Sequence, residues 1–265
     1  MSVKNKILLV DILNHPEFSF LDGFLEVINV AGAGKVKIEV VNPILQGGLD
    51  VIDLEKYSGV IISGSITPYC TKVAWVSEVA DFINRVRSYR SLPLLAICMA
   101  HELVAHIYGG KVRPPGSKKE LGTIDLNLSD AGMKSDLFRG FPKKFKMLAA
   151  HSRDVIQLPD GAIALVYNKR SKYQAFKLDN LFCVQFHAEV DALTLRNWLL
   201  IHGSIDELIA QKFINEPSEL NHFLETEVYE TRYRIDFFRN FIDMCVAEKL
   251  HSGHEYIKKT HVCRY

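Results

Sequence analysis

Cys98 lies where a predicted buried strand meets a predicted helix, a position that suits a nucleophilic thiol. Pro93 precedes the apolar run 94–97, and apolar residues then recur at helical spacing until Gly109 and Gly110 end the pattern. The free N–H groups and the positive dipole end of such a helix favour the thiolate, which is the nucleophilic form of cysteine. For a cysteine taken alone, a structural residue buried on a core strand is the better interpretation.

A second segment, 181–191, supplies a base and an acid. Residues 184–186 are predicted to form a strand, and His187 and Glu189 follow at its end. Side chains two residues apart in an extended chain point to the same face, so these two are expected to lie together. A carboxylate beside an imidazole holds the ring in one tautomer and stabilises the imidazolium. We therefore predict that His187 is the base for Cys98 and that Glu189 orients His187. The chain order Cys, His, Glu argues against an α/β-hydrolase, in which the acid precedes the histidine.

The elements that must position these residues alternate in the manner of a doubly wound α/β sheet. Residues 111–129 and 145–166 are predicted to add shorter strands before the one that carries His187. The main strands are expected at 6–10, 36–41, 59–62 and 94–97, with helices near 18–30 and 74–89.

Beyond His202 the pattern is helical to the last residue. Phe238, Phe241 and Cys245 belong to an apolar stripe at helical spacing, which is typical of a helix packed on a core. We therefore expect one domain over residues 1–202 and a C-terminal helical extension, residues 203–265, packed on the same domain. The extension could complete the domain, cover part of the site or form a homodimer contact.

Composition narrows the class of protein. A chain of 265 residues can bury one substantial α/β core. The formal net charge of +1, with both signs interspersed, predicts no field that would draw the chain to nucleic acid or to an anionic membrane. The first apolar run stops at Asp11 without a cleavage site, and no stretch is long enough to span a bilayer. Five cysteines do not suggest a disulfide framework, so we expect a cytoplasmic protein.

Several segments, in this order, resemble the class I glutamine amidotransferases over roughly residues 5–200. They are YSGVIISG at 57–64, AICMAHE at 96–102, the E-x-G of 120–122, HSRDVIQLP at 151–159, and a closing segment at 174–189 that contains VQFHAE. Within this family the chain resembles a stand-alone form of the amidotransferase domain of GMP synthase. This resemblance implies a flavodoxin-like, doubly wound, mostly parallel sheet with helices on both faces.

The same resemblance assigns roles to individual residues. It makes Cys98 the nucleophile, His187 the base and Glu189 its partner. It also places backbone amides near Gly64, Ser65 and Met99 at the oxyanion, and Glu102 beside the substrate. It implies neither a cofactor nor a metal.

The departures from the family pattern bear on the substrate. Alanines stand at 96 and 100, where the elbow normally carries glycine, Ser65 and Ile66 follow Gly64, and Ala188 replaces a proline. Glu102 replaces a glutamine, and an ionised carboxylate can only accept hydrogen bonds whereas an amide also donates them. This change suits a substrate other than glutamine.

The sequence therefore predicts a hydrolase that cleaves glutamine or a related γ-glutamyl amide through a thioester on Cys98. The alternatives are a γ-glutamyl peptidase or amidase with a non-glutamine substrate, and a non-catalytic binding protein that keeps the fold. The expected partner is a small-molecule amide. Because the sequence holds no nucleotide-binding motif and no synthetase domain, any ammonia used in synthesis would pass to a separate protein.

Overall fold

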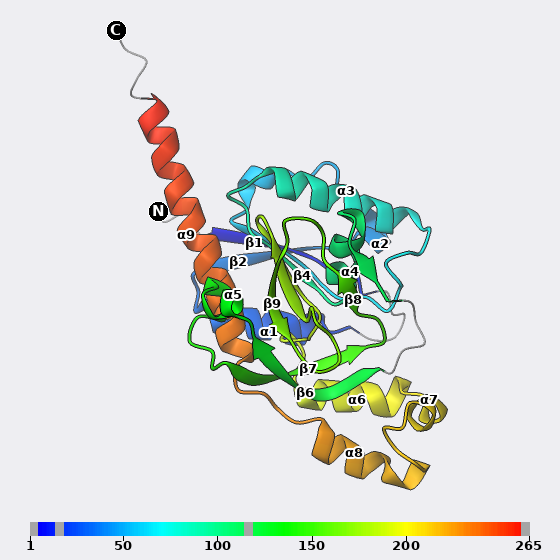
Figure 1. Ribbon diagram of the computed structural model, residues 1–265. Helices are drawn as coiled ribbons and strands as arrows, with labels where there is room; N and C mark the ends of the chain where they lie inside the picture. The colour runs from blue at the N-terminus through cyan, green and yellow to red at the C-terminus, as the bar shows by residue number, and fades with distance from the viewer. Residues whose placement is uncertain (1–4, 14–18, 114–118, 261–265) are drawn as a thin grey trace.

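The computed structural model describes residues 5–13, 19–113 and 119–260. Its main feature is a nine-stranded sheet in the order β2-β1-β3-β4-β11-β10-β9-β6-β7 (Figure 1). The strands of this sheet are β1 Asn5–Val10, β2 Val36–Val41, β3 Gly59–Ile62, β4 Leu94–Ile97, β6 Glu120–Leu128, β7 Lys144–His151, β9 Ile163–Tyr167, β10 Ala175–Leu178 and β11 Leu181–Val184. A small second sheet pairs β5 Lys111–Val112 with β8 Val155–Gln157.

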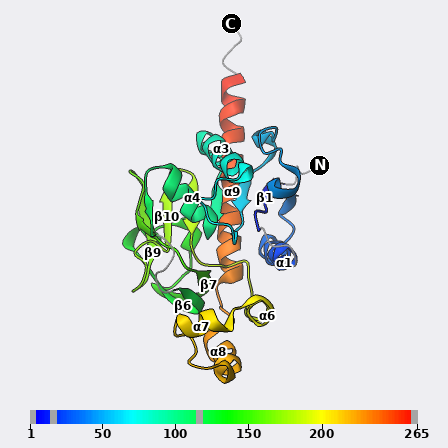
Figure 2. The same cartoon turned by 90° about the vertical axis from the view of Figure 1, so that its right-hand side faces the viewer.

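The helices pack on both faces and at one end of this sheet (Figures 1 and 2). They are α1 Leu21–Gly32, α2 Pro43–Gln46, α3 Ala74–Ser88, α4 Met99–Ile107, α5 Asp130–Met133, α6 Ala192–His202, α7 Ile205–Ala210, α8 Leu220–Glu227 and α9 Arg234–Thr260. From β2 to β11 neighbouring strands are parallel, and from β11 to β7 they are antiparallel. The predicted doubly wound sheet and its β-rich addition are therefore both present.

The central strands read as unbroken apolar runs because both of their faces are covered. Ile7 and Leu9 of β1 point into one buried cluster with α1 and α9, whereas Leu8 and Val10 point into another with α3 and α4. Leu94 to Ile97 of β4 divide between the same two clusters and are fully buried. This two-sided burial fixes the register of the strands that carry the site.

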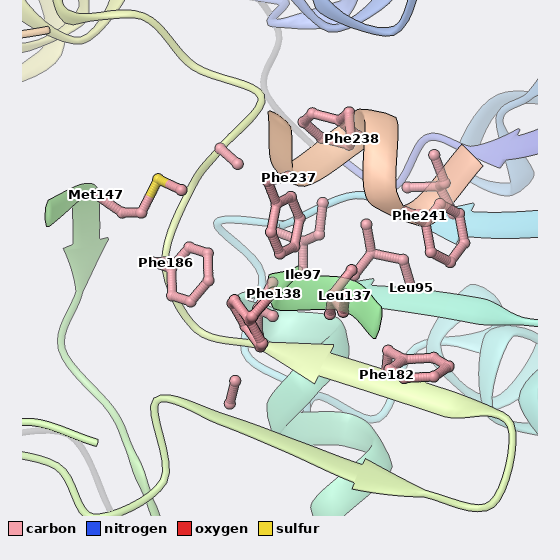
Figure 3. Packing of buried hydrophobic residues seen from close by; sticks show 14 of the residues in the cluster. Leu95, Ile97, Leu137, Phe138, Met147, Phe182, Phe186, Phe237, Phe238 and Phe241 are labelled. Carbon is pink, nitrogen blue, oxygen red and sulfur yellow. The ribbon is translucent and has the colours of Figure 1, made fainter. Parts of the chain in front are cut away.

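The C-terminal residues form separate helices that pack on the rest of the chain. Phe237, Phe238 and Phe241 of α9 are fully buried over the sheet face that carries Leu95 and Ile97 (Figure 3). Helices α6, α7 and α8 instead gather beyond β6 and β7, where a third apolar cluster forms (Figures 1 and 2). No helix in the described ranges combines the length and apolarity that a membrane span requires.

Two predicted boundaries differ from the structure. The first helix begins at Leu21 rather than near residue 18, which lies outside the described residues. The strand before His187 ends at Val184, so residues 185–189 do not continue it as predicted. Strands β3 and β4 have the limits that the sequence predicts.

Candidate active site

Cys98 occupies a sharp corner between β4 and α4. Its backbone angles, φ 51° and ψ −105°, are unusual for a residue other than glycine. The Cys98 N–H donates to the Val184 carbonyl over 2.8 Å and thereby ties the corner to the end of β11. The flanking Ala96 and Ala100 are completely buried, so the small side chains that replace the usual glycines fit against the core. The structure thus contains the predicted strand-to-helix elbow.

His187 reaches the same edge of the sheet because β11 lies next to β4. The two strands are parallel and pair Val184 with Ile97, so the chain segments that follow them emerge side by side. The His187 N–H donates to the Leu148 carbonyl over 2.8 Å. His187 Nδ1–H donates to Glu189 Oε1 over 2.6 Å.

The prediction that His187 and Glu189 meet is confirmed, but the predicted extended chain is wrong. After β11, residues 185–189 form bends with one isolated antiparallel bridge between His187 and Leu148 of β7, and the side chains of His187 and Glu189 meet across this bent segment. Glu189 is 4% exposed, so its carboxylate meets His187 with little competition from water.

The charges around His187 favour its imidazolium form. Burial acts to lower the pKa of His187, but the negative charges of Glu189 and Cys98 and hydrogen bonds to both outweigh it, so the pKa lies well above the usual 6.5. A positively charged ring beside the sulfur can give a proton to a leaving group. The arrangement can therefore hold a nucleophile and a proton donor side by side.

The loop after β3 packs directly against this pair. A Cβ built on Gly64 would lie 3.2 Å from the Cβ of Cys98 and 3.2 Å from the Cε1 of His187. Ser63 Oγ–H donates to Asp11 Oδ1 over 3.2 Å, which holds the loop to the end of β1. In the described part of the chain, the N–H groups of Gly64, Ser65 and Met99 have no hydrogen-bond acceptor. Such unpaired donors beside a nucleophile can stabilise an oxyanion.

Glu102 lies one helical turn after Cys98 and is 2% exposed. Gln185 Nε2 donates to Glu102 Oε1 over 3.3 Å and lies 3.7 Å from Cys98 Sγ. Burial raises the pKa of Glu102 to about 7, although the positive charges of Arg153 and His151 oppose this shift. Glu102 Oε2 and Arg153 Nε are buried and have no partner among the described residues.

A second buried carboxyl group, Glu120 at the start of β6, lies nearby. It accepts hydrogen bonds from Gln174 Nε2 at 2.5 Å and Asn168 Nδ2 at 2.6 Å, and His151 Nε2 is 3.2 Å away. Burial alone would raise the pKa of Glu120, but these three partners outweigh it and lower the pKa. Folding therefore moves the pKa values of these two carboxyl groups in opposite net directions, upward for Glu102 and downward for Glu120 once the partners of Glu120 are included.

All seven residues that the sequence predicts for the site line one cavity of about 310 Å³. They are Cys98, His187, Glu189, Gly64, Ser65, Met99 and Glu102. Within the described ranges, no three His, Cys, Asp or Glu side chains are grouped so as to hold a metal ion.

Sequence reasoning missed two residues of this site, Arg153 and Gln185. Both lie inside segments that carry the family resemblance, HSRDVIQLP and VQFHAE. A buried carboxyl group at position 102 needs a nearby cation or hydrogen-bond donor. This need was the one feature of the sequence that could have pointed to such partners. The partners are 51 and 83 residues away in sequence, at positions that only the fold brings close.

Comparison with known proteins agrees with this geometry. The family model described as glutamine amidotransferase class-I matches residues 26–202. Gamma-glutamyl peptidase 4 of Arabidopsis thaliana is 31% identical over 52% of this chain, and the match spans only 55% of the peptidase. The glutamine-hydrolyzing GMP synthase subunit of Thermococcus kodakarensis is 32% identical over 54% of this chain and 71% of its own.

The fold extends the similarity along more of the chain. A glutamine amidotransferase structure from Thermotoga maritima superposes with a TM-score of 0.72 and covers 92% of this chain and 98% of its own, at 20% identity. Because the family model covers most of the chain and the fold agrees with it, the protein belongs to the class I glutamine amidotransferase family.

Proposed function

We propose that this protein is a cysteine-dependent amide hydrolase that cleaves glutamine or a related γ-glutamyl amide through a thioester on Cys98. The observation that supports this most strongly is the shared cavity, in which the elbow cysteine lies against a histidine that is bonded to a buried carboxylate. A thiolate, a proton donor and free oxyanion donors are the groups that acyl transfer needs.

In the first half of the reaction, Cys98 Sγ attacks the amide carbon and forms a C–S bond. The carbonyl oxygen becomes an oxyanion, which the amides of Met99 and the 64–65 loop stabilise. The His187 imidazolium gives a proton to the amide nitrogen, the C–N bond breaks, and the amine leaves. The acyl group then remains on Cys98 as a thioester.

In the second half, neutral His187 takes a proton from water, and the hydroxide attacks the thioester carbon. The C–S bond breaks, the acid is released, and the Cys98 thiolate faces the imidazolium again. Glu189 keeps the ring oriented through both halves, since its bond to Nδ1 leaves the other ring nitrogen for the proton transfers.

Glu102 and Arg153 suit the remote end of a γ-glutamyl group. One helical turn, about 5.4 Å, separates Glu102 from the nucleophile along α4, a distance comparable to the glutamyl side chain. A carboxylate and a guanidinium with unpaired atoms match the α-ammonium and the α-carboxylate of a free amino acid. Both residues line the cavity.

The names of the relatives support both glutamine and other γ-glutamyl amides as substrates. One relative is a gamma-glutamyl peptidase, and the other belongs to a glutamine-hydrolyzing synthase. Glutamine and every other γ-glutamyl amide carry the same α-amino acid head group, so the proposed contact with Glu102 admits both. If glutamine is the substrate, its ammonia would pass to a separate acceptor protein. A reactive thiol requires a reducing compartment, which supports a cytoplasmic location.

Intact-mass spectrometry across a panel of amides tests the proposal. A glutamine-analogue electrophile should add to wild-type protein and to Cys70→Ala, which removes an exposed cysteine, but not to Cys98→Ala. Turnover of at least one γ-glutamyl amide should disappear in Cys98→Ala. Labelling that persists in Cys98→Ala would remove the nucleophile assignment, and no turnover of any amide would leave a binding protein with this fold.

A further inference from the structure

The cavity continues from the reacting groups into a space with apolar walls, which we call the apolar chamber. Its walls are Phe20, Leu121, Leu195, Trp198, Leu208 and Phe213. These side chains come from residues before α1, from β6, and from the α6–α7 region, and all belong to one apolar cluster. Four of them, Phe20, Leu121, Trp198 and Phe213, are only partly buried and so retain surface that a ligand could cover.

The chamber begins beside His187. Leu148, whose carbonyl accepts the His187 N–H, and Val190, which follows Glu189, belong to the same apolar cluster and line the cavity. Helix α6 starts two residues after Val190, so its apolar side chains follow the catalytic segment directly. Glu102 of α4 and Arg153, whose positive charge acts on Glu102, line the same cavity. Lys119 and Glu207 also line it, next to the apolar walls.

The far wall of the chamber is tied to the residue before β6 by polar contacts, and two of the residues that make them also line the cavity. Lys119, just before β6, forms an ion pair with Glu207 of α7. Its backbone N–H also donates to Gln211 Oε1 over 3.1 Å. Leu208 and Phe213 lie beside these anchors and beyond residue 202, where the match to the family model ends. This wall is therefore a feature of the C-terminal extension.

We propose that the apolar chamber binds the amine portion of the substrate, and that the protein prefers γ-glutamyl amides whose amine carries a bulky apolar or aromatic group. This inference rests on the proposed function. The acyl group must stay bonded to Cys98, on the side of Glu102, while the amine receives its proton from His187. The amine substituent consequently faces the groups beyond His187, which are the walls of the chamber. Ammonia from glutamine would leave this space empty.

The size of the effect follows from apolar burial. One methylene group in a hydrophobic pocket changes specificity by about 10- to 200-fold. A phenyl ring adds several such groups, so γ-glutamyl-phenethylamide should have a kcat/KM at least about tenfold above that of γ-glutamyl-ethylamide. The two amides share the same acyl group and closely similar leaving amines, so the ratio reports on the chamber.

The test compares this ratio in the full-length wild type and in chamber variants. Phe213→Ala should lower the ratio about tenfold or more. Leu200→Ala, which truncates an exposed side chain on α6 outside the cavity, should leave the ratio unchanged. A wild-type ratio near or below one would overturn the proposal without any variant, and would leave the apolar walls as a contact for a protein partner.

A binding measurement separates failure of this inference from failure of the proposed function. N-phenethylacetamide lacks the glutamyl group and should change the fluorescence of Trp198, whereas N-ethylacetamide at the same concentration should not. The only other tryptophan, Trp75, lies on α3 and does not line the cavity, so the change should vanish in Trp198→Phe. Binding without turnover of any amide would refute the hydrolase alone, and turnover without selectivity or binding would refute the chamber alone.

Discussion

Replacing Glu102 by glutamine should stabilise the protein, and increasingly so at higher pH. The folded state raises the pKa of this carboxyl group, so the protonated form is favoured on folding. In the wild type, Glu102 therefore does not lower the free energy of unfolding below pH 4.5. The wild type loses stability as the pH rises from 4.5 through about 7. A rise in pKa from 4.5 to about 7 costs about 3 kcal/mol at pH 9, because each pKa unit is worth about 1.4 kcal/mol. Glutamine has a similar shape and does not titrate.

Urea denaturation at pH 5, 7 and 9 measures this difference. The free energy of unfolding of Glu102→Gln minus that of the wild type should grow by about 2 to 3 kcal/mol between pH 5 and pH 9. Glu120→Gln is the matched control, since the folded state lowers the pKa of Glu120 below 4.5. The stabilisation from Glu120 is lost only as the pH falls below this value, so the difference for Glu120→Gln should stay constant between about pH 5 and pH 9. A constant difference for Glu102→Gln across this range would refute the assignment of a buried, strained carboxyl group.

The same variant also tests the contact with the substrate. If the Glu102 carboxylate binds the α-ammonium of a γ-glutamyl group, KM should rise as the pH falls through about 7, because the protonated acid loses its charge. In Glu102→Gln this rise in KM should disappear, while the pH dependence of kcat should remain. A purely structural Glu102 would leave the pH dependence of KM unchanged.

Two further substitutions probe the catalytic pair, and a third serves as a control. Gly64→Ala adds a methyl group 3.2 Å from both Cys98 and His187, so kcat should fall at least about tenfold as they separate. Gly23→Ala, whose added Cβ meets nothing within 4 Å, should leave kcat unchanged and stabilise α1 by up to about 1 kcal/mol. Glu189→Gln removes the charge that raises the pKa of His187, so the alkaline limb of kcat/KM should move to lower pH. If the alkaline limb of kcat/KM stays at the same pH, that limb reports the titration of a group other than His187.

The strand that carries the nucleophile, β4, and its neighbour β3 were predictable to the residue because both are covered on both faces. Such strands read as short apolar runs between breaking residues, as at Gly59–Ile62 and at Leu94–Ile97 after Pro93. The strand before His187 was misplaced because Gln185 and Phe186 continue the apolar and polar alternation of an extended chain. In the structure Gln185 turns inward to hold Glu102, and this contact depends on a residue 83 positions earlier. Alternation alone cannot detect a bend that a distant partner stabilises.

The apolar chamber was beyond sequence reasoning for a related reason. In the sequence, Trp198 and Phe213 have the spacing of apolar residues in amphipathic helices. This spacing indicates only that one face of a helix packs against other residues. Which face borders a cavity depends on where α7 is anchored, and that is decided by Lys119, which lies almost 90 residues earlier in the chain. The pattern therefore predicted a helical extension but left its role open.

The cost of the Glu102 environment bears on what the site binds. A buried carboxyl group with one unpaired oxygen is destabilising, and an amide at the same place would avoid the titration penalty. Arg153 only partly offsets this penalty, because the pKa of Glu102 still lies near 7. A ligand that brings its own positive group to Glu102 and its own negative group to Arg153 would satisfy both. An α-amino acid head group carries that pair of charges, so the residues that weaken the empty site are the ones that would strengthen binding of a γ-glutamyl substrate.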